Sequence, residues 1–551
     1  MDRRAFLTAR RAKKPALAAA DEFRTESGLN PYQGAWTRNE AQHLLKRLMF
    51  GSTKQDVDHF AALSMEQAVD ELLNPSAALP APPLNDYTED MVDPVVAAGA
   101  TWINNPSDNN ELNEFRQRSF KKWWTGVMIN QDRSIREKLT LFWADHWGTE
   151  TDTIKAAHFM YKHNDLLRRS CLGNFRRMVK DVTIDPGMLI YLNGYLNNAS
   201  APDENYAREL MELFTLGKGP TVEYTEPDVR TAAKVLTGWR IDPITYEVYF
   251  EPAEHDTDNK TFSSYYNNTT ITGRTGADGV LETDDLINML FAKQEVSRYI
   301  CRCIYRWFVY YKIDAAAEAN VITPLAAIFR TNNYEIRPVL EALFKSEHFF
   351  DVLNQGCMIK SPVDHVIGCM REFGVVFPAV ATEYMDAYSM WERIMAVMAS
   401  MGQDVGDPPD VSGWPAYYQE PSFHEMWITH DTLPKRNQFT DVMTWNGYTR
   451  NEKTLIIDVI AFTKTLPNPG DPNALVNDAL GVLYRVPVSD AAKLSIKQTI
   501  LLSSQTQDYY WTNAWNGYLA DPGNMQAQTI IANRLKAFYQ YLMNLSEYQL
   551  S

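Results

Sequence analysis

Histidines and carboxylates in the first half of the chain are the side chains best suited to hold a metal ion. His146 follows Asp145, while His163 and Glu212 lie farther along the same region. Imidazole and carboxylate groups together form ligand sets for zinc or iron. These four residues are therefore candidate ligands of a divalent metal, the one cofactor that the sequence suggests. Their spacing matches no standard signature such as H-E-x-x-H, and a core or capping role for His146 beside Trp143 is favoured.

The densest run of charged residues covers positions 204–217. On a helix, Glu204, Arg208 and Glu212 are spaced at i, i+4 and i+8, which predicts a ladder of opposite charges. Three interpretations remain open: a buried structural network, a surface ladder, and an active site with Arg208 and Glu209 as catalytic groups. The apolar residues of the segment favour the buried network. We therefore expect one helix over 202–217, with Arg208 facing inward and paired with Glu204 or Glu212.

His255 and Asp256 open a polar run that the sequence places in a loop. A carboxylate that orients an imidazole makes a general base, so both residues are catalytic candidates. An Asx turn, formed by the Asp and Asn side chains of the run, is the favoured alternative. Cys301 and Cys303 have the spacing of a C-x-C metal motif, but their apolar neighbours favour buried thiols.

Other signatures of function are missing from the sequence. It contains no G-x-S-x-G elbow, no phosphate-binding P-loop and no dinucleotide fingerprint. The formal net charge of −16 repels phosphate backbones, which argues against nucleic acid as a partner. No run approaches 18 consecutive apolar residues, so no transmembrane segment is predicted. Aromatic residues make up 12% of the chain and suit a core, an interface or a sugar-stacking surface equally.

The elements that would position these residues are mostly helices. Capping boxes at Thr37 and Ser64 begin two of them, and residues 75–94, rich in proline, predict an extended linker or a surface loop. Alternating apolar residues near 241–280 predict a small β-hairpin insertion. We therefore expect an all-α fold, mainly helical and in two lobes, with that one insertion. The predicted divisions are a poorly ordered basic arm over 1–36, an N-terminal lobe over 37–240, the insertion over 241–280, and a C-terminal lobe over 281–551.

The N-terminus resembles a twin-arginine export signal at Arg3 and Arg4, which precede Phe6 and Leu7. The apolar segment that such a signal needs does not follow, because more Arg and Lys residues come next. By its own sequence the chain is therefore expected in the cytoplasm, with residues 1–20 contributing little to stability.

Short motifs along the chain recur together, in this order, in one bacterial family. They are HLLKR (43–47), FG (50–51), REKLTLFW (136–143), DPGML (185–189), ENYAREL (204–210), TGW (237–239), HD (255–256), KTF (260–262), SP (361–362), GWP (413–415) and SEYQ (546–549). The chain closely resembles the family known as domain of unknown function 1800. The family commonly has a histidine two positions before His146, where this chain has Ala144, and that difference weakens the metal hypothesis.

The resemblance implies a mostly helical protein that is commonly exported to the periplasm or envelope. It also implies that the gene lies beside a gene of a second family, which looks like the alkaline phosphatase and sulfatase superfamily. It implies no activity. The leading hypothesis is therefore a binding or scaffold protein that acts with a phosphatase- or sulfatase-like partner at the cell envelope. The alternative is a metal-assisted hydrolase that uses the His and carboxylate candidates, and whether the chain is an enzyme stays open.

Overall fold

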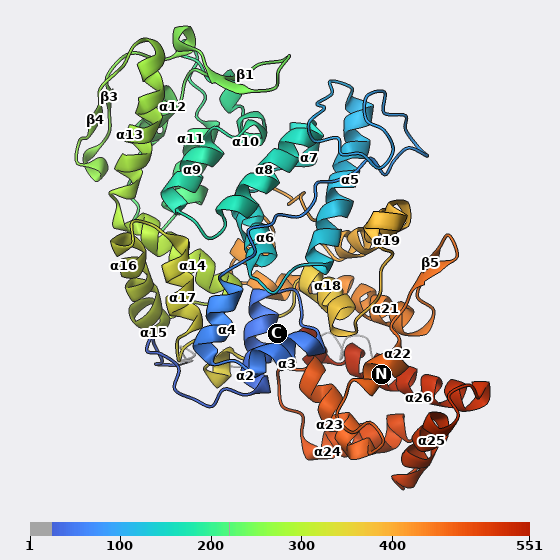
Figure 1. Cartoon of the computed structure of the whole chain (residues 1–551). Coiled ribbons are helices and arrows are strands. Elements are labelled where there is room, and N and C mark those ends of the chain that lie inside the picture. The colour runs from blue at the N-terminus through green and yellow to red at the C-terminus, as the bar shows by residue number, and fades with distance from the viewer. Residues whose placement is uncertain (1–24, 220) are drawn as a thin grey trace, which may run out of the picture.

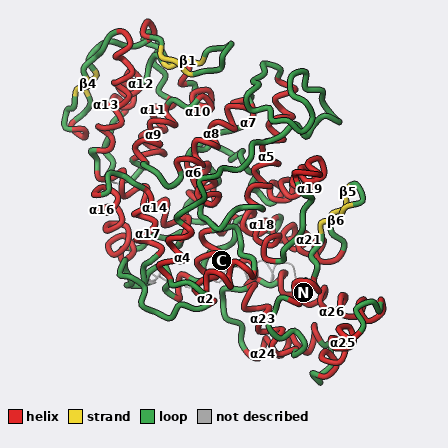
Figure 2. The backbone as a smooth tube through the Cα atoms, viewed as in Figure 1, coloured by secondary structure: helices red, strands yellow, loops and turns green. Residues whose placement is uncertain are grey.

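The computed structural model of the chain describes residues 25–219 and 221–551, and Figure 1 traces them from the N-terminus to the C-terminus. Helices hold 57% of the residues, and the described part contains only three small two-stranded sheets. Figure 2 shows these sheets as short yellow segments among the helices. The predicted fold class, mainly helical with a small β insertion, is confirmed. No helix among the described residues is long and apolar enough to span a membrane.

The first helices begin at the predicted capping boxes. Thr37 and Glu40 cap α2 reciprocally, and Ser64 and Gln67 cap α4 in the same way. In each box two backbone N–H groups that have no partner inside the helix gain one. The bounds in this region are α2 (Arg38–Leu48), α3 (Lys54–Ala61) and α4 (Met65–Leu72).

A bundle of helices follows the irregular segment 73–109. Its members are α5 (Asn110–Ile129), α6 (Arg136–His146), α7 (Thr151–Ile154), α8 (Ala157–Ser170), α9 (Phe175–Thr183), α10 (Pro186–Tyr191), α11 (Asn205–Glu209) and α12 (Glu226–Val235). α11 continues as a π-helical stretch, η2 (Leu210–Thr215). The helix expected over 202–217 therefore covers 205–215 and changes its winding partway.

Two antiparallel hairpins occupy the predicted insertion, and they form the upper left of Figure 1. β1 (Trp239–Ile241) pairs with β2 (Val248–Phe250), and β3 (Lys260–Thr261) pairs with β4 (Thr270–Ile271). A third hairpin, β5 (Tyr448–Arg450) with β6 (Lys453–Leu455), was not predicted. It lies in a polar stretch that lacks a run of alternating apolar residues, so the sequence carried no strand signal there.

Helices fill the rest of the chain. They are α13 (Val280–Phe291), α14 (Gln294–Phe308), α15 (Ala315–Ala317), α16 (Thr323–Thr331), α17 (Ile336–Phe344), α18 (Pro362–Glu372), α19 (Val380–Ser400), α20 (Pro415–Tyr418), α21 (Thr432–Trp445), α22 (Val459–Lys464), α23 (Pro472–Leu483), α24 (Asp490–Ser495), α25 (Tyr509–Ala520) and α26 (Met525–Asn544). The last four gather at the lower right of Figure 1.

Helices from the two predicted lobes pack directly on each other. α19 lies along α5, α18 also contacts α5, and α4 contacts α17. The division into lobes stays a prediction. Within the predicted basic arm, Tyr32 donates its backbone N–H to the oxygen of Lys345 (2.9 Å), and Thr25 donates its hydroxyl to Asp351 (2.5 Å). Residues 1–24, which include the arginine pair, lie outside the described residues, so the expectations for them stay predictions.

Candidate functional site

A pocket of about 450 Å³ opens between α5, α19 and the irregular segment 76–84. The rings of Trp123 on α5 and of Tyr388 and Trp391 on α19 line it, and the last two have ring centroids 5.0 Å apart. Leu79, Pro80 and other apolar residues of the segment form the opposite side. A concave, mostly apolar site of this size, with a few polar groups, is the usual form of a ligand site.

Gly126 explains how α5 and α19 come close enough to form the aromatic side of the pocket. Gly126 faces the Trp391 ring, and a Cβ at this position would lie 2.5 Å from ring atoms. Because real side chains do not approach so closely, glycine is what lets the indole lie against the α5 backbone.

Two residues of the same pocket carry unpaired polar groups. The indole N–H of Trp391 is shielded from solvent and has no hydrogen-bond partner within the described residues. The side-chain amide of Gln131, another lining residue, is likewise unpaired at both its oxygen and its nitrogen. Such groups cost free energy when they stay unpaired, and both belong to residues of the pocket wall.

Side chains at the pocket hold the irregular wall in place through its backbone. Trp123 donates from Nε1 to the oxygen of Ala81 (2.6 Å), and Arg136 donates from Nη1 to the oxygen of Ala78 (2.7 Å). The hydroxyl of Tyr388 accepts the N–H of Leu84 (3.0 Å). These three bonds replace the ladder or helix bonds that an irregular segment lacks, and so they shape the pocket.

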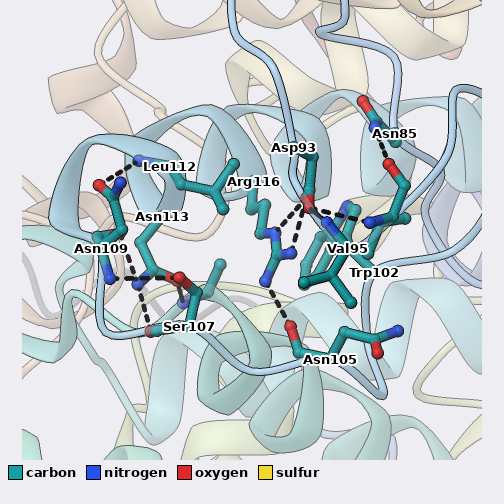
Figure 3. A network of polar contacts seen from close by, with 12 residues as sticks. Asn85, Asp93, Val95, Trp102, Asn105, Ser107, Asn109, Leu112, Asn113 and Arg116 are labelled. Carbon is teal, nitrogen blue, oxygen red and sulfur yellow. Dashed lines mark hydrogen bonds and ion pairs between the residues drawn. The ribbon is translucent and has the colours of Figure 1, made fainter.

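A buried ion pair fixes the continuation of this wall, residues 85–109 (Figure 3). Arg116 on α5 contacts Asp93 through Nε (3.1 Å) and Nη2 (2.7 Å), and its Nη1 donates to the oxygen of Asn105 (2.5 Å). Asp93 also accepts the backbone N–H groups of Val95 and Val96. One arginine thereby joins two distant points of the loop to α5.

The four predicted metal ligands have separate partners. Asp145 accepts the N–H of Trp414 (2.8 Å), His146 contacts the backbone oxygen of Phe214 (3.1 Å), His163 contacts Asp185 (3.0 Å), and Glu212 pairs with Lys218 (2.6 Å). No group of three or more His, Cys, Asp or Glu side chains in the described residues is arranged to hold a metal ion. The sequence therefore identified polar residues with structural partners, and the structure does not bring them into one cluster.

Burial shifts the pKa of two of these candidates. Burial raises the pKa of the Asp145 carboxyl well above its ordinary value, and it lowers the pKa of His146 to about 4. His146 is therefore neutral near pH 7. Gly413 has a positive φ and lies so close to Asp145 that a Cβ would not fit, so the GWP motif packs its turn against this carboxyl.

Arg208 is paired as predicted, but it does not face inward. It contacts Glu204 (3.1 Å) and Glu226 (2.7 Å), with Glu212 at 3.8 Å, and 30% of its side chain is exposed. The expectation of a buried pair is therefore wrong, and the surface ladder describes this segment. Glu209 is partly buried, and burial together with the charge of Glu212 raises its pKa.

His255 and Asp256 belong to a buried polar cluster, although they do not form the predicted dyad. Nδ1 of His255 lies 2.9 Å from the oxygen of Thr237, and Nε2 lies 3.1 Å from Glu282 in a poor hydrogen-bond geometry. Asp256 accepts the N–H of Asp258, the expected Asx turn. Lys260 completes the cluster through Glu282 (2.7 Å). The cluster ties the hairpins to α13.

Sequence analysis missed the residues that form the pocket. Tyr388 and Trp391 are spaced at i, i+3, which places both on one face of α19, and this spacing was a usable signal. Their position beside Trp123 could not be predicted from the sequence, because it depends on how α5 and α19 pack. The cysteine prediction is confirmed in part: Cys301 and Cys303 are both free, but Cys301 is buried whereas Cys303 is half-buried.

Comparison with known proteins identifies a family. A model of the family described as protein of unknown function (DUF1800) matches residues 43–550. No curated protein and no solved structure matches the chain. Because the match covers nearly the whole chain, the chain belongs to this family.

Proposed function

We propose that this member of the DUF1800 family is a binding protein, and that its aromatic pocket takes an aromatic side chain of a protein partner. The observation that carries the proposal is the pocket itself, where Trp123, Tyr388 and Trp391 surround space for a ring. Rings packed in this way gain about 0.5–1.5 kcal/mol beyond the area they bury. Protein interfaces use such pockets to hold an aromatic anchor.

The polar edge of the pocket narrows the choice of side chain. A tyrosine ring brings a hydroxyl that both donates and accepts, which complements the unpaired Trp391 indole and Gln131 amide. A phenylalanine ring would leave both groups unpaired. The pocket is therefore expected to favour tyrosine, presented on an exposed segment of the partner.

The partner we propose is a phosphatase- or sulfatase-like protein at the cell envelope, and this part rests on the family resemblance alone. Purification of the full chain from its native cells with cross-linking, followed by mass spectrometry, tests it. Recovery of such a protein through contacts with residues 76–84 or α19 would support the proposal. Cross-links confined to other faces would contradict it.

A ligand-binding test examines the tyrosine preference of the pocket without the partner protein. We expect N-acetyltyrosinamide to show saturation-transfer NMR signals with the full chain, and N-acetylphenylalaninamide to bind about tenfold more weakly, since one lost polar contact costs about 1.4 kcal/mol. Trp391→Phe keeps a ring but removes the indole donor, so it should abolish this difference. Trp445→Phe is the matched control, because Trp445 donates to Gln540 away from the pocket. Equal binding of both amides to the unmodified chain would overturn the tyrosine assignment.

A further inference from the structure

A second pocket, of about 420 Å³, lies between the β3–β4 hairpin and α13, and we call it the hairpin pocket. The hairpin runs beside α13 at the upper left of Figure 1. Its segment 261–272 reads TFSSYYNNTTIT, so hydroxyl and amide side chains dominate it. Phe262, Tyr266 and Ile271 are buried, whereas the other residues of the segment are exposed or half-buried. The hairpin therefore brings a mostly polar wall to the pocket.

Contacts with two helices hold this wall in position. The backbone N–H of Ser263 donates to the carboxylate of Asp228 on α12 (2.7 Å). Beyond the hairpin, the backbone N–H of Arg274 donates to the carboxylate of Glu282 on α13 (2.6 Å). Because the segment is tied near both of its ends, the wall is formed before a ligand binds, which reduces the entropic cost of binding.

Three side chains of the lining keep their hydrogen-bonding groups unused. Asn267, Thr272 and Asn288 line the pocket, and none of their side chains makes a hydrogen bond with the residues that the structure describes. All three residues are exposed. Asn267 has a φ of 57°, a left-handed conformation that asparagine tolerates better than most residues. Each amide supplies donors and an acceptor, and the threonine hydroxyl supplies both kinds of group.

The charged residues of the lining also combine donors with an acceptor. Arg274 donates from Nη1 to the carboxylate of Asp285 (2.5 Å), and both residues line the pocket. Lys293 is the third charged residue of the lining, and its ammonium group lies 4.0 Å from the centroid of the Tyr265 ring, a favourable cation–π position. The lining therefore suits a ligand whose own groups both donate and accept hydrogen bonds.

Two other classes of ligand fit this lining poorly. A flat base needs an open ring on which to stack, but Tyr266, the aromatic residue of the lining, is only 1% exposed. An apolar ligand would cover the amides and hydroxyls without pairing them, which costs free energy. Met289 and Ala292 on α13 still supply a small apolar area for C–H groups.

We propose that the hairpin pocket binds a neutral saccharide. Adjacent hydroxyls on a sugar ring each donate and accept, as the amides and hydroxyls of the lining do. The C–H faces of the ring match the small apolar area on α13. The volume also lies within the range of about 300–1,000 Å³ that is usual for small-molecule pockets. The hairpin pocket shares no residue with the aromatic pocket, so this proposal is independent of the proposed function.

The test uses the full chain and saturation-transfer NMR with D-glucose, D-galactose, cellobiose and lactose as probes. Melting temperature is a poor readout here, because sugars stabilise proteins in general by exclusion from their surfaces. We expect saturable binding of at least one of these sugars. D-Glucuronate and D-galacturonate, which add a carboxylate, should bind no more tightly than the corresponding neutral sugars. No saturable binding of any neutral probe, or tighter binding of the uronates, would overturn the proposal.

Variants locate the binding. Asn288→Leu removes the amide and should weaken binding of the best probe about tenfold. Thr272→Val keeps the shape of the side chain without its hydroxyl and should weaken binding severalfold. Both variants should fold, because neither side chain is used by the fold for a hydrogen bond within the described residues.

Asn533→Leu on α26 is the matched control, since Asn533 is also exposed on a helix and its side chain has no hydrogen bond with the described residues. It should leave sugar binding unchanged, and Asn288→Leu should leave the binding of N-acetyltyrosinamide unchanged. Sugar affinity that is unaffected by both Asn288→Leu and Thr272→Val, or reduced equally by Asn533→Leu, would contradict the assignment to the hairpin pocket.

Discussion

Arg168 on α8 and Glu137 on α6 form a two-pronged ion pair directly behind the aromatic pocket. Nε and Nη2 of Arg168 lie 2.7 Å and 3.0 Å from the two oxygens of Glu137, which also accepts the indole N–H of Trp124 at 3.3 Å. Arg168 further stacks on Trp123, with its guanidinium carbon 5.1 Å from the ring centroid. One buried arginine therefore holds both Glu137, which lines the pocket, and Trp123, which is part of its aromatic wall.

Removal of that arginine should be strongly destabilising. Arg168→Met leaves the buried Glu137 carboxylate without its counter-charge, so the free energy of unfolding should fall by about 3–5 kcal/mol. Urea denaturation followed by circular dichroism measures the change. Arg208→Met is the control, because its pairs are exposed to solvent and should contribute little to the free energy of unfolding. If both variants lose a similar amount of unfolding free energy, the buried Arg168 pair stabilises the fold no more than the exposed pairs of Arg208 do.

Asp93→Asn should loosen the loop without unfolding the helices. The substitution removes the charge that Arg116 contacts at two points, so residues 85–109 lose their main attachment to α5. We expect faster amide hydrogen exchange across 76–109 and little change elsewhere. Asp165→Asn, which affects an exposed pair with Arg169, is the control. If residues 76–109 exchange their amide hydrogens at the same rate in the Asp93 variant and in the unmodified chain, other contacts hold the loop.

Acid should destabilise the fold through its buried histidines. Burial lowers the pKa of His43 to about 3 and the pKa values of His146 and His158 to about 4, from an ordinary value of 6.5. The unfolded chain therefore binds protons near pH 6.5, whereas the folded chain binds them only at lower pH. The stability is fully present above pH 6.5 and is lost as the pH falls toward 4.

Each of these histidines contributes up to about 1.4 kcal/mol per pH unit in that window. His146→Gln should reduce the slope of unfolding free energy against pH, as measured by urea titration at several pH values. A slope unaffected by His146→Gln would contradict the inference that His146 is neutral in the folded protein.

Local spacing explains which features the sequence predicted well. The capping boxes at Thr37 and Ser64 depend on residues three positions apart, and both formed as expected. The helical class and the hairpins near 241–280 follow from periodicity in the same way. Arg208 found a carboxylate at i−4, but its exposure depends on what covers the helix, which spacing does not encode. Glu282, the partner of His255 and Lys260, comes from α13 and could not be assigned from the polar run alone.

Gly126→Ala should destabilise the protein and close the aromatic pocket together. The added methyl group would lie 2.5 Å from the Trp391 ring, so α19 or the indole must move. The cost of such overpacking is about 1–3 kcal/mol, against a gain of up to about 1 kcal/mol from replacing glycine within a helix. Gly481→Ala on α23 separates the two effects, because no atom lies within 4 Å of the new Cβ and only the helix gain applies. We therefore expect a lower melting temperature and loss of N-acetyltyrosinamide binding for Gly126→Ala, with a higher melting temperature and unchanged binding for Gly481→Ala. A stabilised Gly126→Ala that still binds the amide would show that Trp391 moves freely and that close packing of α5 on α19 does not shape the pocket.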